Sequence, residues 1–98
     1  MNTIGMNKDA MDIYFEALDI FQNKFGNNHL AVAEVFHCMG YALDDQDAPD
    51  QALDCLEESR NIRKHLLGPD AMEVGLVLNF MGCIQNKRGE LDDALSLL

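Results

Sequence analysis

The chain has 98 residues, of which 48% are hydrophobic, and a formal net charge of −10 at pH 7. This composition predicts one small folded domain, and no stretch approaches the roughly 20 consecutive apolar residues that a membrane span requires. The negative charge argues against nucleic acid and against an anionic membrane surface, because few cations are present to neutralise phosphates. It favours a basic partner at long range.

The chain has three cysteines, an odd number, and no two of them are close in sequence: Cys38, Cys55 and Cys83. The first dozen residues contain no apolar run of the kind found in secretion signals, so we expect reduced thiols and a cytoplasmic protein. Zinc fingers need two Cys or His close together, twice, and this arrangement does not occur. We therefore expect no metal and no cofactor.

Apolar residues at three- and four-residue spacing predict helices along the chain, and strands are not expected. The first helix covers residues 7–25 and ends at Gly26, and the second runs over about 30–45. The third begins near Pro49 and runs to about residue 67; Pro49 lies in its first turn, where the missing N–H costs nothing. Asp47 is expected to cap it.

Two further helical segments complete the chain. The fourth helix covers about residues 71–87, after Gly68, which is expected to end its predecessor in a left-handed conformation, as Gly26 does. The fifth begins near Glu90 and stops at Leu98, after little more than two turns. We interpret it as the cut or degenerate end of an array.

The order of the helices follows an internal repeat of 42 residues. About a dozen residues are identical after this shift; Gly26 aligns with Gly68, and Met39-Gly40 with Met81-Gly82. The repeat divides the single array of residues 1–98 into three parts. Residues 7–25 are the second helix of a partial repeat, 29–67 a full helix pair, and 70–98 a helix pair with a truncated second helix.

A helix pair with Met-Gly in its first helix and Ala followed by a bulky residue in its second resembles the tetratricopeptide repeat. The residues that carry this resemblance are Phe36, Met39, Gly40, Ala52 and Leu56, and again Leu78, Met81, Gly82, Ala94 and Leu98. Glycine at the crossing lets two helix backbones approach closely. The 42-residue period, with Leu67-Gly68-Pro69-Asp70 between units, is similar to the repeat of kinesin light chains.

The resemblance implies an all-α, right-handed superhelical stack of antiparallel helix pairs. It also implies a non-catalytic scaffold whose first helices line a concave groove that holds a peptide. Asn79 matches an asparagine that contacts the peptide backbone in that family, whereas His37 stands at the equivalent position of the other unit. The expected peptide-binding residues are Glu34, His37, Tyr41, Asp44, Asp45, Leu76, Asn79, Cys83 and Asn86.

The acids Glu34, Asp44 and Asp45 on this face favour a peptide that carries Lys or Arg, although the same acids are also typical of a solvated helix face. Neighbours on a helix such as His37 and Cys38 point about 100° apart, so they are not expected to form a metal or nucleophilic site. Cys38 is expected to pack between helices. No acid–base pair or phosphate-binding loop indicates an enzyme.

We therefore expect a protein-interaction module that binds a basic or mixed peptide. The alternative is a structural segment that self-associates through its end helices, with further repeats or with another copy.

Overall fold

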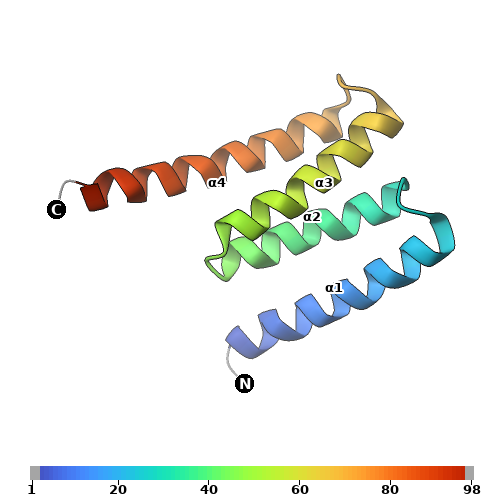
Figure 1. Ribbon diagram of the computed structural model, residues 1–98, viewed down its shortest axis with the longest axis horizontal. Helices are drawn as coiled ribbons and strands as arrows, with labels where there is room; N and C mark the ends of the chain where they lie inside the picture. Colours follow the sequence, from blue (N-terminus) through green and yellow to red (C-terminus); the bar gives the residue numbers. More distant parts are fainter. Residues whose placement is uncertain (1–2, 97–98) are drawn as a thin grey trace.

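The computed structural model describes residues 3–96, with side chains from residue 10 to residue 89. It contains four helices in this range: α1 (Thr3–Phe25), α2 (Leu30–Asp45), α3 (Pro49–Leu67) and α4 (Met72–Ser96) (Figure 1). No strand occurs among the described residues. The predicted all-α helical repeat stack is therefore confirmed.

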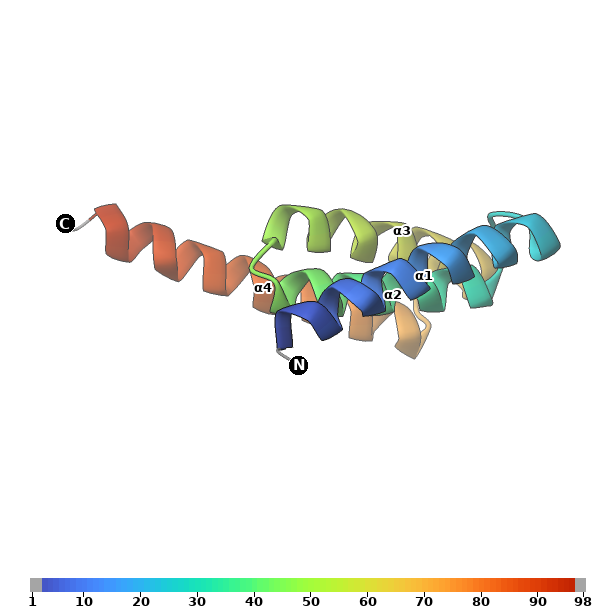
Figure 2. The same ribbon diagram turned by 90° about the horizontal axis from the view of Figure 1, so that it is seen from below.

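Successive helices run in opposite directions and pack mainly on their neighbours in the chain, α1 on α2, α2 on α3 and α3 on α4 (Figure 1). The molecule is a thin slab with extents of 50 × 40 × 15 Å. Viewed from below, α4 projects well beyond the turn that joins α2 to α3 (Figure 2).

Short turns with defined ends separate the helices. Gly26 and Gly68 have φ angles of 83° and 95°, which confirms the positive φ predicted for both. The Gly68 N–H donates to the Lys64 carbonyl at 2.9 Å, closing the last turn of α3. At the start of α2, His29 Nδ1 accepts from the Ala31 N–H at 3.0 Å and acts as the N-cap.

The turn between α2 and α3 differs in detail from the prediction. Pro49 occupies the first turn of α3, as expected, but the N-cap is Ala48 and makes no side-chain cap bond. Asp47 instead takes a positive φ of 59°, in the left-handed region that Asp tolerates better than most residues. Asp47 therefore reverses the chain rather than capping the helix.

The pairing of α2 with α3 depends on a close approach at Gly40. A Cβ atom placed there would lie 2.7 Å from Cγ of Leu56, which is fully buried. About two turns along α2 from Gly40, the buried Ser59 hydroxyl of α3 donates to the Ala33 carbonyl at 2.9 Å. These contacts leave no room between the two backbones and fix their relative position.

Both outer helices add to the core of this central pair. Val77 and Ile84 of α4 are buried with Met39 and Leu56, whereas on the opposite side Phe21 of α1 packs against the buried residues of α2. The side of α2 that faces α1 and the side of α3 that faces α4 are thereby covered.

The last helix departs from the prediction for residues 70–98. The sequence predicts a turn before a short second helix near Glu90, but the backbone of α4 continues as one helix through Gly89 to Ser96. Leu97 and Leu98 lie outside the described residues. A turn at this point would break several backbone hydrogen bonds, and nine residues bury little surface in return, whereas α3 has 19 residues to bury after its turn.

The close approach at Gly40 is tested by Gly40→Val, which places a branched side chain against Leu56. We expect the free energy of unfolding to fall by about 1–3 kcal/mol in urea denaturation, as is typical of overpacked cores. Gly75→Val is the matched control, because a Cβ atom there meets nothing within 4 Å. The control should leave stability unchanged or slightly higher, since Val has the better helix propensity. Equal stability of the two variants would contradict the packing argument.

Candidate functional site

A groove opens between α2 and α4, with one side chain of α3 at its edge, and encloses a cavity of about 520 Å³. We call it the α2–α4 groove. It is lined by Glu34, His37, Tyr41, Arg63, Glu73, Leu76, Asn79, Phe80 and Cys83.

The groove brings together six of the nine side chains expected to bind a peptide. They are Glu34, His37, Tyr41, Leu76, Asn79 and Cys83. Asp44, Asp45 and Asn86 do not line it, because they lie toward the other end of α2 and further along α4. Whether any of these residues binds a peptide stays a prediction.

Three rings form the centre of the groove. The Tyr41 ring centroid lies 4.3 Å from that of Phe80, and the His37 centroid lies 5.0 Å from Tyr41 and 6.0 Å from Phe80. Phe80 is half-buried, whereas Tyr41 is 54% exposed. The cluster thus joins α2 to α4 and also presents aromatic surface to solvent.

Arg63 of α3 crosses to the α2 side of the groove. Its Nη2 donates to Glu34 Oε2 at 2.9 Å, and its Nη1 lies 3.3 Å from His37 Nδ1. The Arg63 side chain is only 11% exposed, whereas Glu34 is 68% exposed. The guanidinium therefore neutralises the acid that was expected to attract a basic peptide.

The arrangement around Arg63 also sets the protonation of His37. A guanidinium only donates, so Nδ1 must accept and the ring proton resides on Nε2. Burial lowers the pKa of His37 below its ordinary value of 6.5, and the charge of Arg63 lowers it further, against a smaller opposite effect of Glu34. His37 is thus a neutral hydrogen-bonding group near neutral pH.

Three lining residues were not expected from the sequence: Arg63, Glu73 and Phe80. Arg63 belongs to a second helix, whereas the prediction considered only first helices. The position of Arg63 could have been predicted from its spacing of four residues from the buried Ser59, because this spacing places both residues on the side of α3 that faces α2. Phe80 aligns with Cys38, for which interhelical packing was expected, and no pattern distinguished Glu73 from other surface acids.

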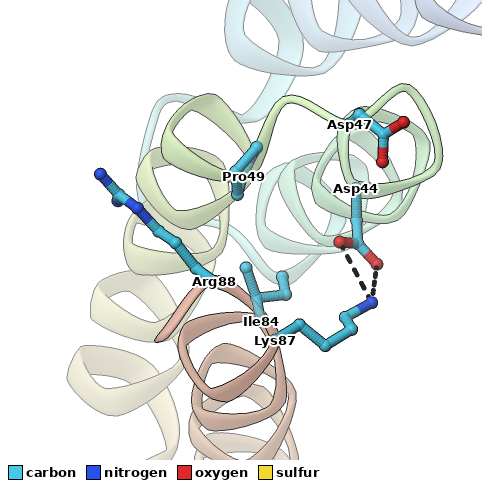
Figure 3. A pocket seen from close by; sticks show the side chains of 6 residues that line it. All are labelled: Asp44, Asp47, Pro49, Ile84, Lys87 and Arg88. Atoms are coloured by element: carbon cyan, nitrogen blue, oxygen red, sulfur yellow. Dashed lines mark hydrogen bonds and ion pairs between the residues drawn. The ribbon is translucent and has the colours of Figure 1, made fainter. Parts of the chain in front are cut away.

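A second cavity, of about 500 Å³, lies next to the α2–α3 turn (Figure 3). Lys87 Nζ of α4 reaches Asp44 Oδ2 at 3.2 Å, and the buried Ile84 of the same helix also lines the cavity. Arg88 points to the other side of Pro49 (Figure 3) and forms an ion pair with Asp50. Asp44, like Glu34, therefore already has a cationic partner within the chain.

The thiols and acids offer little for catalysis. Burial raises the pKa of Cys38 and of Cys55, so both thiols remain largely protonated; nearby acids raise these pKa values further. Cys83 is exposed in the groove. Among the residues whose side chains are described, no three His, Cys, Asp or Glu side chains gather closely enough to hold a metal ion.

The fold and the groove together define a helical-repeat protein, in which stacked helix pairs present a shared surface. The sequence model of the tetratricopeptide repeat matches residues 32–98, about two thirds of the chain, and the chain belongs to that family. Members of the family are generally non-catalytic modules for protein–protein interaction. A comparison with curated proteins gives no match. None of the helices, over the described residues, is long and apolar enough to cross a membrane.

The lowered pKa of His37 predicts a pH dependence of stability. Between this pKa and 6.5 the unfolded chain binds more protons than the folded one, so the free energy of unfolding falls as the pH falls through this window. The variant His37→Asn keeps an acceptor for Arg63 but does not titrate. We therefore expect it to lose less stability than the native chain between pH 7.5 and pH 5.5, measured by urea denaturation.

The matched control is His65→Asn, which replaces an exposed histidine of α3. It should keep the pH dependence of the native chain. An identical loss of stability in the native chain and in His37→Asn would contradict the assignment.

Proposed function

We propose that the protein is an interaction module that binds an extended peptide in the α2–α4 groove. The observation that carries the proposal is the exposed aromatic surface of Tyr41 and Phe80, flanked by the amide of Asn79. An aromatic floor holds an apolar peptide side chain, and a primary amide can donate to and accept from a peptide backbone. The helices are braced by the core, so the groove needs little ordering when it binds.

The charges of the groove favour a mixed peptide over a strongly basic one. Glu34 is paired with Arg63 and Asp44 with Lys87. Glu73 is exposed and has no ion-pair partner in the described part of the chain. We therefore propose a peptide with an apolar or aromatic anchor and one Lys or Arg that reaches Glu73.

The repeat itself is proposed to be of the kinesin-light-chain type, which the 42-residue period supports. An odd number of cysteines suits a reducing compartment, so we propose that the protein acts in the cytoplasm.

Binding is tested with a pair of fluorescent peptides of equal length, each with a central Phe, flanked by Arg in one and by Glu in the other. We expect the Arg peptide to bind more tightly in anisotropy titrations. Tyr41→Ala should weaken both peptides about tenfold or more, as expected for a central aromatic contact. Asn79→Ala should also weaken both, because its amide contacts the backbone.

The role of Glu73 is tested by Glu73→Gln, which should weaken only the Arg peptide, by about two- to fivefold at low salt. Glu58→Gln removes an exposed acid of α3 outside the groove and serves as the charge-matched control. Absence of binding to the folded chain, or binding that Tyr41→Ala and Asn79→Ala leave unchanged, would refute the groove as the site.

A second candidate function is self-association through α1. The seven-residue spacing of Ile13 and Ile20 places both on one face of α1, where they are 62% and 54% exposed, more than most large apolar side chains in the described part of the chain. Light scattering over a range of protein concentrations distinguishes self-association from peptide binding by a monomer. A dimer that Ile13→Lys disrupts, together with no peptide binding, would favour the second function.

A further inference from the structure

A third cavity, of about 470 Å³, lies where α1, α2 and α3 meet. No residue lines both this cavity and the α2–α4 groove. We call it the α1–α3 cleft. It is lined by Met11, Phe15, Met39, Leu43, Gln46, Gln51, Asp54 and Cys55.

Much of the lining of the cleft is apolar. Met11, Met39 and Leu43 are buried, whereas Phe15 of α1 has 55% of its surface exposed. Methionine side chains are flexible and polarisable, so they adjust to the shape of an incoming apolar group. An exposed aromatic ring beside such a lining supplies a large contact area. The cleft therefore suits an apolar side chain of a partner.

The α3 side of the cleft carries acids without cationic partners. Asp54 lines the cleft and Glu58 follows one turn later; both are exposed, and neither forms an ion pair in the described part of the chain. The pKa of the Cys55 thiol is raised first by burial and then by both carboxylates, so their charges act at the cleft. These acids are available to a cation, whereas Glu34 of the α2–α4 groove is already paired with Arg63.

The spacing of the two acids matches that of side chains on a helix. Asp54 and Glu58 are four residues apart, which is about 6 Å along the axis of α3. A partner helix that lies alongside α3 has its own residues at the same spacing. Two basic residues four apart can then meet both carboxylates, while an apolar residue on the adjoining face reaches Phe15.

We propose that the α1–α3 cleft binds a basic amphipathic helix of a partner protein, with a large apolar side chain against Phe15 and Met39 and with Lys or Arg on Asp54 and Glu58. A small molecule is a poorer occupant, because Phe15 and Asp54 are exposed and ligand sites usually enclose most of the ligand. A second copy is also poorer, because each chain carries a net charge of −10. The inference goes beyond the proposed function, since the cleft and the α2–α4 groove share no residue.

The probe for the test is a fluorescent helical peptide of about 18 residues, with Leu along one face and Lys at four-residue spacing beside it. We expect the folded chain to bind it about tenfold more tightly than a peptide of the same composition in scrambled order, in anisotropy titrations at low salt. Replacing each Lys by Glu should abolish binding. Equal binding of the helical and scrambled peptides overturns the proposal.

Variants of the chain locate the contact. Phe15→Ala should weaken the helical peptide about tenfold, whereas Phe25→Ala, on the same helix but outside the cleft, should leave its affinity unchanged. Asp54→Asn should weaken the peptide about two- to fivefold at low salt and less at high salt. Asp70→Asn is the charge-matched control, because Asp70 is an exposed acid in the turn between α3 and α4.

Three results would overturn the proposal. One is equal loss of affinity in Phe15→Ala and Phe25→Ala, and another is equal loss in Asp54→Asn and Asp70→Asn. The third is binding that Tyr41→Ala abolishes and Phe15→Ala leaves unchanged, which would place the helical peptide in the α2–α4 groove. Because the extended peptides of the earlier test bind elsewhere, failure of either site leaves the result for the other intact.

Discussion

The close approach of α2 and α3 at Gly40 is the constraint on which the rest of the molecule depends. With no side chain at this position, Leu56 packs directly on the α2 backbone, and the two helices form a single unit. The short distance between the two helices brings Arg63 of α3 within reach of Glu34 and His37 on α2. The same unit supplies the surface on which Val77 and Ile84 seat α4, and this in turn places Phe80 against Tyr41.

Much of the fold follows from sequence periodicity alone. The spacing of apolar residues, the glycines at 26 and 68, and the 42-residue repeat predict six of the observed helix boundaries to within one residue: the end of α1, both ends of α2 and α3, and the start of α4. The end of α4 could not be predicted in this way, because it depends on a balance between continuing a helix and burying a short segment. The positive φ of Asp47 was not predicted either, since Asp is common both as a helix cap and in left-handed turns.

The candidate site was predictable in outline, because residues on one helix face follow from spacing, as Tyr41 and Asn79 do. The ion pairs were not, because long side chains such as Arg63 and Lys87 select partners on other helices. These pairs change the electrostatic picture. The chain as a whole is strongly acidic, yet two of the acids expected to define the site are neutralised locally. Long-range attraction and local recognition therefore favour different features of a partner.

The thin, serial packing of the helices has a consequence for how the chain folds. Each helix rests mainly on its neighbours in sequence, so most contacts close short loops, and chains of this kind fold quickly. The same arrangement makes cooperativity decrease toward the ends, because α1 and α4 each have one main neighbour and the central pair has two. Amide hydrogens of α2 and α3 are then the slowest to exchange with solvent. The groove, with one wall on α4, persists only as long as that outer helix stays in place.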